Sequence, residues 1–393
     1  MKGFIKYASL LMAAVMLASC QGQGGEEGGS TGSRTLTVTS DKNLIQTFGG
    51  DYANITVKLD DEVVTEGVTF FDGKNKVISI PDFKFAADEV GEYQIWANYG
   101  TYNSETITIK AISTEIPETP ADPKPSSTDF KVRVLLSEFT TVGCTACPNM
   151  KLVLHDAMES ISDKVVAVEC HSGLVNNVAD PCYIQTGFDE FCAITGYPTV
   201  NLDMYSTFSN YTLGASSFNS LVGQLYDAKE DAAAGIAVNS CYENGQLVAK
   251  VTVKAAQEGA YRVGAFLLED GIYGKQLGGL AEEWMDTHDG VVRYIDSQYY
   301  SNGDKYYGHS LGNLKSGDTA DYMFVWMMDE IWAEGSRNGE VSGGVAWSPF
   351  NEDNLHLAVF VSTVGEDKKG NQYYYVNNVI DCPVNGQTPY EYR

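Results

Sequence analysis

Two cysteines separated by two residues, Cys144-Thr145-Ala146-Cys147, are the feature that most constrains the fold of this chain. They follow an apolar run at 132–136, which predicts a strand, and precede residues 149–161, whose pattern predicts a helix. The first turn of a helix offers unpaired N–H groups and a positive dipole potential, and both stabilise a thiolate. The sequence therefore predicts a dithiol at the N-terminus of a helix, joined as a disulfide when oxidised, with Cys144 as the attacking sulfur.

Two further features support this interpretation. Glu138 lies six positions before Cys144 on the predicted strand, and Tyr197-Pro198-Thr199 opens a later apolar strand. The expected element order from residue 129 to 234 is β-α-β-α-β-β-α, which resembles the thioredoxin-like fold. That resemblance implies that Glu138 passes a proton to or from Cys147. It also implies that Tyr197 and a cis Pro198 lie beside the dithiol and hold the substrate backbone.

A narrower resemblance rests on several motifs spread over about residues 130–390. The chain resembles the outer membrane protein twenty-eight-related lipoproteins at Leu135-Leu136-Ser137-Glu138-Phe139-Thr140, Gly143-Cys144, Cys147-Pro148, His171-Ser172-Gly173, Tyr197-Pro198-Thr199, Glu269-Asp270-Gly271 and Asp289-Gly290-Val291-Val292-Arg293. The resemblance implies an outer-membrane lipoprotein with a thioredoxin-like domain and a β-rich C-terminal domain. Surface receptor and adhesin roles are suggested for that family as readily as redox roles. The chain departs from thioredoxins proper at Gly143, where they carry tryptophan, and at Pro148.

The N-terminus predicts export and lipidation. Residues 1–19 combine a basic start with a short apolar run and end in Leu17-Ala18-Ser19, so Cys20 resembles the lipidated cysteine of a bacterial lipobox. The alternative is an ordinary signal peptide in which this cysteine is incidental. Residues 20–33 are glycine-rich and predict a flexible tether. We therefore expect an outer-membrane lipoprotein whose membrane partner is reached through the Cys20 lipid, at the cell surface or on the periplasmic face.

Charge narrows the range of partners. The chain has 26 basic and 52 acidic residues and a net charge of −26. Nucleic acids and anionic lipid surfaces attract basic patches, so we expect no nucleic-acid partner.

The chain is long enough for several domains, and the predicted class is multidomain α/β plus all-β. Residues 34–112 predict an immunoglobulin-like β-sandwich that serves as a spacer, in which Glu89, Gly91 and Tyr93 resemble a tyrosine corner. Residues 113–128 hold four of the eleven prolines and predict a stiff linker. The thioredoxin-like domain follows at 129–234, and a C-terminal β-sandwich is predicted at 235–393.

The remaining cysteines suggest an oxidising compartment. Seven of the eight cysteines remain if Cys20 is lipidated, and this odd number leaves at least one without a partner in the chain. Cys182 could pair with Cys192, and Cys241 with Cys382. Cys170 is expected to be an inert core thiol.

Two functions remain open from the sequence. The first is thiol–disulfide exchange on exported or surface proteins through Cys144 and Cys147. The second is a non-enzymatic surface binding protein or adhesin, with a permanent disulfide and with aromatic side chains that contact proteins or glycans. A metal held by Cys144, Cys147 and either Cys170 or His171 is the weakest interpretation, because no second Cys-x-x-Cys or paired histidine spacing completes the ligand set. We expect no metal and no cofactor, and His171 is interpreted as a polar residue at a strand end.

Overall fold

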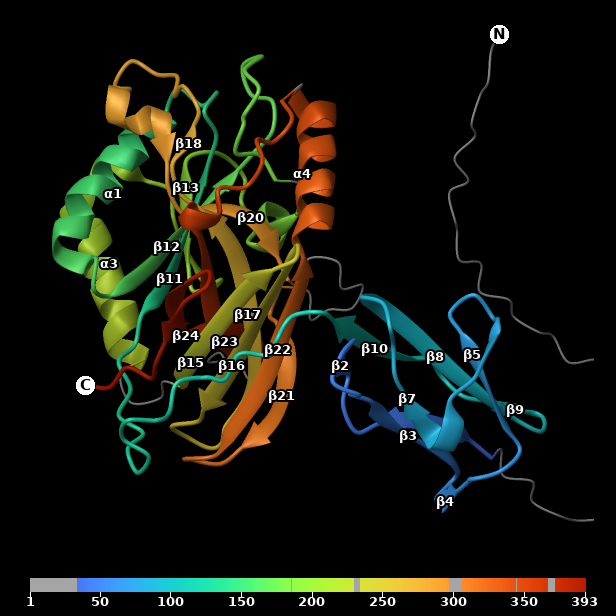
Figure 1. Ribbon diagram of the computed structural model, residues 1–393. Coiled ribbons are helices and arrows are strands. Elements are labelled where there is room, and N and C mark those ends of the chain that lie inside the picture. Colours follow the sequence, from blue (N-terminus) through green and yellow to red (C-terminus); the bar gives the residue numbers. More distant parts are fainter. Residues whose placement is uncertain (1–33, 185, 230–233, 297–305, 344, 367–371) are drawn as a thin grey trace, which may run out of the picture.

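The computed structural model describes residues 34–393 except 185, 230–233, 297–305, 344 and 367–371 (Figure 1). The predicted signal peptide at 1–19, the lipidated Cys20 and the tether at 20–33 lie outside the described residues. Within the described part, no helix is both long and apolar enough to cross a membrane.

Residues 34–112 form a two-sheet β-structure around one apolar core. The first sheet contains β1 (Leu36–Ser40), β3 (Ala53–Leu59), β4 (Glu62–Val63) and β7 (Lys84–Phe85). The second contains β2 (Leu44–Gln46), β5 (Val68–Asp72), β6 (Val77–Ile78), β8 (Gly91–Tyr99), β9 (Tyr102–Asn103) and β10 (Ile107–Ile112). The alternation of buried and exposed residues along β3 places every second side chain in the core. Tyr93 donates a hydrogen bond from its hydroxyl to the carbonyl of Glu89 at 2.8 Å, which is the tyrosine-corner contact that the sequence predicts.

The segment predicted as a stiff linker lies against the body of the protein. The Nζ of Lys250 lies 2.7 Å from Glu118 Oε2, and the Nζ of Lys254 lies 2.9 Å from Asp122 Oδ2. Thr119 and Thr252 also exchange a hydrogen bond at 2.8 Å. Residues 113–128 therefore follow a strand of the C-terminal region rather than forming a free spacer.

The region from 129 to 234 has the predicted element order. It contains β11 (Val134–Thr140), α1 (Cys147–Ile161), β12 (Val165–His171), α2 (Phe188–Phe191), β13 (Thr199–Leu202), β14 (Ser206–Phe208) and α3 (Gly214–Lys229). β11 pairs in parallel with β12 and antiparallel with β13. Helices α1 and α3 share one buried cluster with the strands, in which Met150 and Phe218 join Val134 and Leu136.

The structure joins the two regions that the sequence analysis separates at residue 234. Strand β20 (Val291–Ile295) pairs in parallel with β12 at Val291 and Glu169, so one nine-stranded sheet runs through both regions. Its order is β14-β13-β11-β12-β20-β17-β23-β24, with β21 also paired to β17. The added strands are β17 (Gly259–Glu269), β21 (His309–Leu314), β23 (Leu355–Glu366) and β24 (Gln372–Pro383). Residues 129–234 and 235–393 therefore share one continuous sheet.

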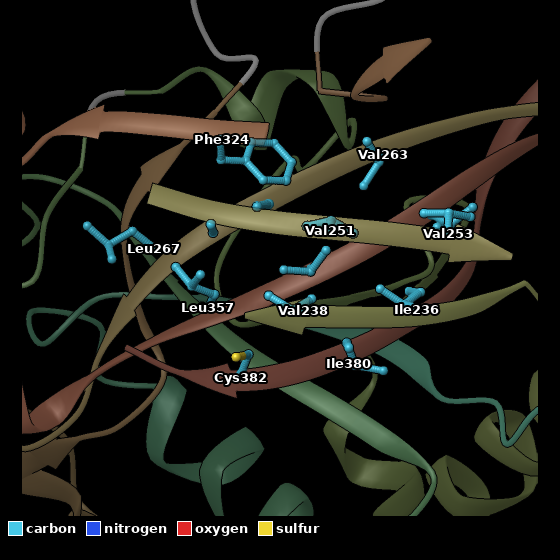
Figure 2. Close-up of a cluster of buried hydrophobic side chains, with 14 of the residues drawn as sticks. Ile236, Val238, Val251, Val253, Val263, Leu267, Phe324, Leu357, Ile380 and Cys382 are labelled. Carbon is cyan, nitrogen blue, oxygen red and sulfur yellow. The ribbon is translucent and has the colours of Figure 1, made fainter. Parts of the chain in front are cut away.

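A second sheet packs on the C-terminal half of the long sheet and completes a β-sandwich (Figure 2). It contains β22 (Thr319–Met327), β16 (Gln246–Lys254), β15 (Gly235–Glu243) and β25 (Gln387–Thr388). The predicted hairpin joins β15 to β16 through Asn244 and Gly245, both with positive φ as a tight two-residue turn requires. Side chains such as Leu267, Leu357 and Phe324 fill the space between the sheets.

Helix α4 (Met328–Gly343) was not predicted, since the sequence analysis expects only strands in this region. Gly335 lies within it, and a Cβ there would come within 2.1 Å of the Trp347 ring. The glycine lowers helix propensity but allows the buried tryptophan to pack against the helix. The contact with Trp347 thus explains why Gly335, which makes the helix hard to predict from the sequence, occupies this position.

Candidate functional site

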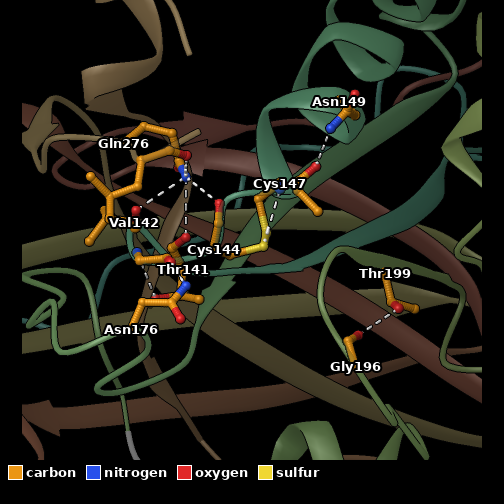
Figure 3. Close-up of a disulfide and its surroundings, with 12 residues drawn as sticks. Thr141, Val142, Cys144, Cys147, Asn149, Asn176, Gly196, Thr199 and Gln276 are labelled. Carbon is orange, nitrogen blue, oxygen red and sulfur yellow. Dashed lines mark hydrogen bonds between the residues drawn. A yellow bond between two sulfur atoms is a disulfide. The ribbon is translucent and has the colours of Figure 1, made fainter. Parts of the chain in front are cut away.

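Cys144 and Cys147 form a disulfide at the N-terminus of α1, as predicted (Figure 3). Their Cα atoms are 5.4 Å apart, which is within the ordinary range for a disulfide. The backbone N–H of Cys147 donates to the Sγ of Cys144 at 3.1 Å. Cys144 is 7% exposed and Cys147 is fully buried, so only Cys144 is open to attack from outside.

Two segments from elsewhere in the chain hold the loop that carries Cys144. The Gln276 side-chain amide lies within hydrogen-bond distance of several loop carbonyls, with Cys144 O the nearest at 3.1 Å (Figure 3). The Leu277 N–H donates to Val142 O at 2.8 Å, and Asn176 Nδ2 donates to Gly143 O at 2.7 Å. The loop is therefore fixed through its carbonyl groups on two sides.

A close backbone contact requires glycine at position 143, where thioredoxins carry tryptophan. A Cβ on Gly143 would lie 2.2 Å from the carbonyl oxygen of Val175, which no side chain tolerates. Gly278 has a φ of +139°, and a Cβ there would lie 2.7 Å from Thr145 O. Both segments approach the dithiol loop closely only because these positions have no side chain.

Glu138 lies on β11 and is 4% exposed. Burial raises the pKa of its carboxyl to about 7, the charge of Glu169 adds to this rise, and Lys151 and His171 oppose it. Its Oε1 has no hydrogen-bond partner among the described residues. Glu138 is therefore a buried carboxyl that gains and loses its proton near neutral pH.

The Tyr197–Pro198 peptide bond is cis, as predicted. It leads into β13, where Thr199 is the register partner of Phe139, the residue after Glu138. Gly196 and Thr199 lie in the surroundings of the disulfide drawn in Figure 3 and share a hydrogen bond of 2.8 Å. The register thus places the strand that follows the cis bond beside the strand that carries Glu138.

A network of buried charges beneath the dithiol was not anticipated from the sequence. Lys151 Nζ lies 3.0 Å from Glu169 Oε1. His171, whose side chain is fully buried, contacts Asp180 Oδ2 through Nδ1 at 2.8 Å and Glu169 Oε2 through Nε2 at 3.0 Å. Burial alone would lower the pKa of His171, but Asp180 and Glu169 raise it to about 9. With carboxylates at both ring nitrogens, His171 carries both protons.

The network is tied to the dithiol loop. Asp180 Oδ2 also accepts from the N–H of Val142 at 2.9 Å, two residues before Cys144. His171 is therefore part of the buried support of the loop, and not only a polar residue at the end of a strand. The one nearby feature of the sequence that could have indicated this role of His171 is the acidic residue Glu169, two positions earlier.

A cavity of about 610 Å³ lies next to Tyr197. Tyr197 donates from its hydroxyl to Asp189 Oδ2 at 3.2 Å within it. The lining is polar and contains the acids Asp189, Glu190 and Glu334. This cavity could accept a polar or basic group from a partner.

The two additional disulfides suggested by the sequence are not formed. Cys170, Cys182, Cys192, Cys241 and Cys382 are free among the described residues. Cys182 lies in the charged network, whereas Cys192 lies in an apolar cluster. Cys382 faces the sandwich core, whereas Cys241 is one residue out of phase with the core residues of β15 and faces away. Each proposed pair is therefore divided between different environments.

Two of the four C-terminal tryptophans are interior residues rather than a surface platform. Trp326 and Trp347 are buried, and the Trp347 ring stacks on the Arg293 guanidinium at 3.7 Å. Trp284 is exposed and lies beside His155.

Comparisons with known proteins give no family assignment. No family model matches the chain, and no curated protein matches it. Among solved structures, HBP35 of Porphyromonas gingivalis is similar over 66% of this chain and 77% of its own, with 16% identity and a TM-score of 0.48. A protein from Agrobacterium tumefaciens is similar over 67% of this chain and 98% of its own, with 12% identity and a TM-score of 0.38. At these values neither structure informs the function of this chain, and the lipoprotein family stays a prediction.

Proposed function

We propose that this chain is a thiol–disulfide exchange protein that acts on exported or surface proteins and is held at the outer membrane by a lipid on Cys20. The observation that carries the proposal is the contact between the Cys147 N–H and the Cys144 sulfur at the start of α1. A donor in that place stabilises a thiolate on Cys144 after reduction. The protonatable carboxyl of Glu138 on the adjoining strand supports the second half of the reaction.

The exchange runs in two steps. In the reduced protein, the Cys144 thiolate attacks one sulfur of a substrate disulfide, the substrate bond breaks, and the first substrate sulfur leaves as a thiolate that takes a proton from water. Glu138 then accepts the proton of Cys147, and the Cys147 thiolate attacks Cys144. The mixed disulfide breaks, and the second substrate sulfur leaves as a thiolate that takes a proton from water. Two electrons pass from the dithiol to the substrate, and the reverse sequence oxidises a substrate dithiol.

The segment around Tyr197 and Pro198 is proposed to hold the substrate. An extended backbone beside this segment would bring a substrate sulfur toward Cys144, the cysteine of the pair that keeps some exposed surface.

Insulin reduction with a chemical electron donor tests the proposal. Wild-type chain should accelerate reduction, and Cys144→Ser should abolish the acceleration. Cys382→Ser is the matched control because Cys382 is a buried thiol in the sandwich core, and it should retain the wild-type rate. Equal rates for wild type and Cys144→Ser would exclude exchange through this dithiol.

A second candidate function is binding without catalysis. The cavity beside Tyr197, lined by acids, favours it because a basic segment of a surface partner fits that charge. In this case the disulfide would be permanent. Asp189→Asn combined with Glu334→Gln should then weaken partner capture, whereas Cys144→Ser should affect only stability.

Attachment to the membrane is tested separately. Labelled fatty acid should be incorporated into the wild-type chain and not into Cys20→Ala, which should leave the membrane fraction. Incorporation into Cys20→Ala would contradict the proposed anchor.

A further inference from the structure

Three buried side chains from separate segments meet beside the charged network. His171 ends β12, Cys182 lies in the connection that follows, and His288 belongs to the short strand β19 (Thr287–His288). One donor atom from each lies within 4.8 Å of the other two. The side chains of both histidines are fully buried, and Cys182 has no measurable exposure.

Each histidine has one ring nitrogen oriented by an acceptor outside the cluster. His171 Nδ1 contacts Asp180 Oδ2 at 2.8 Å, and His288 Nε2 donates to the carbonyl of Gly274 at 3.0 Å. Metal-binding histidines in proteins are commonly oriented in this way by a carboxylate or a carbonyl. The other nitrogens, His171 Nε2 and His288 Nδ1, both lie against Glu169 Oε2, at 3.0 and 3.1 Å. Two imidazoles and one carboxylate therefore converge, with a thiol close by.

We propose that this cluster is a binding site for a zinc-type divalent ion, with His171, Cys182 and His288 as ligands and Glu169 as the fourth. Imidazole and thiolate donors select zinc or cobalt over magnesium and calcium. Ligands of tetrahedral zinc lie roughly 3.5 Å from each other, given bond lengths of about 2.0–2.3 Å. The donors, now up to 4.8 Å apart, therefore move inward when the ion binds.

The net charge of the cluster would stay the same when a divalent ion binds. Without a metal, the cations Lys151 and His171 face the carboxylates of Glu169 and Asp180. A divalent ion would replace the extra proton of His171 and the thiol proton of Cys182, so two positive charges enter and two leave. The net charge of the buried cluster is unchanged, which avoids the cost of an uncompensated ion.

Lys151 is the competitor for the site. Its Nζ lies 3.0 Å from both Glu169 Oε1 and His288 Nδ1, so an ammonium already contacts two of the proposed ligands. A metal ion would displace the contact with His288 while the ion pair with Glu169 persists. Removing the ammonium should therefore strengthen metal binding.

An entry path reaches the cluster at Glu169. The Glu169 side chain is 17% exposed, unlike the two histidines. Together with Lys151 it lines a cavity of about 230 Å³ whose wall includes the exposed Trp284. An ion can therefore meet the carboxylate first and then the buried donors.

Cobalt substitution of the full chain, with Cys144 and Cys147 kept oxidised, tests the proposal. One equivalent of Co²⁺ should produce a thiolate-to-cobalt charge-transfer band that added zinc removes. The band should vanish in Cys182→Ser and persist in Cys170→Ser, a matched buried thiol outside the cluster. Lys151→Met should bind at least tenfold more tightly than wild type. No band, or an equal band in Cys182→Ser, would overturn the assignment.

Two controls keep the test decisive. A double variant, Cys144→Ser with Cys147→Ser, abolishes thiol exchange but should keep the band, so failure of the proposed function and of the metal site are distinguishable. Loss of the band in this double variant would place the metal at the dithiol and overturn the assignment. If Cys182→Ser does not fold, the melting temperature of wild type decides: it should rise with zinc and saturate at one equivalent. No rise, or an equal rise with magnesium, counts against the site.

Discussion

The long sheet has two interiors that differ in chemistry. Between the sheets of the sandwich, the buried cluster is made of apolar side chains and one cysteine (Figure 2). Between the same long sheet and the N-terminal half of α1 lie the buried Glu138, Lys151 and His171 and the half-buried Glu169. The contrast follows the position of the dithiol, since the polar interior lies below the loop that carries Cys144.

The apolar interior and the charged interior contribute differently to stability and to function. Apolar burial stabilises at about 25 cal/mol per Å² without a need for partners. Buried charges gain little net stability and must all be paired, so a cluster of them suggests a role other than stability. In the register of the sheet, Glu138 and Glu169 are direct neighbours, an arrangement of like charges that Lys151 compensates.

The largest effect is expected from breaking the charged interior. Lys151→Ala leaves the half-buried Glu169 without its ammonium partner and should lower the free energy of unfolding by about 3–5 kcal/mol. Urea unfolding measures this change. Lys315→Ala, at an exposed lysine, is the control and should change stability by less than about 0.5 kcal/mol. A Lys151→Ala loss as small as the control would show that the cluster does not depend on its charge balance.

The sandwich interior should respond to volume and not to charge. Leu267→Ala removes a fully buried side chain and should lower the free energy of unfolding by about 3–4 kcal/mol, through lost burial and the cavity left behind. The loss should be the same at pH 5 and pH 8, because no titratable side chain belongs to this apolar cluster except Cys382 and its tyrosines. A loss that differs between these two pH values would show that the stability of the sandwich interior depends on the charged groups beside α1.

A smaller effect should appear in the pH dependence of stability. The folded pKa of Glu138, about 7, is above its ordinary value of 4.5, so the folded state binds the proton more tightly than the unfolded state. Stability should therefore fall as the pH rises from about 4.5 to 7. Glu138→Gln should remove about 3 kcal/mol of this fall. A further loss between pH 6.5 and 9 comes from His171 and His356, whose pKa values are both raised to about 9 and which stabilise the fold at lower pH. Unchanged pH profiles for wild type and Glu138→Gln would contradict a neutral carboxyl at low pH.

The smallest effect is expected at the thiol of the sandwich core. Cys382→Ala deletes one buried sulfur and should cost about 1 kcal/mol, in reducing and oxidising buffers alike, because Cys382 is free. Calorimetry in the two buffers checks this. A destabilisation seen only in oxidising buffer would indicate a disulfide to Cys241.

The sequence predicts what depends on neighbouring residues. The Cys144 and Cys147 spacing, the helix that starts there and the hairpin turn at Asn244 are local patterns, and the structure contains them. The pairing of β12 with β20 could not be predicted from the sequence, because Glu169 and Val291 are far apart in sequence and no local pattern links them. The same holds for the charged cluster, whose members come from several segments.

Trapping of a mixed disulfide tests the central claim most directly. Cys147→Ser, incubated with a peptide disulfide and analysed by mass spectrometry under native conditions, should carry one peptide per chain, attached at Cys144. Burial raises the pKa of the other thiols, Cys170, Cys182, Cys192, Cys241 and Cys382, so they hold little thiolate and should stay unmodified. Absence of the adduct, or the same adduct in a chain that also carries Cys144→Ser, would show that the dithiol is structural and would contradict the exchange function.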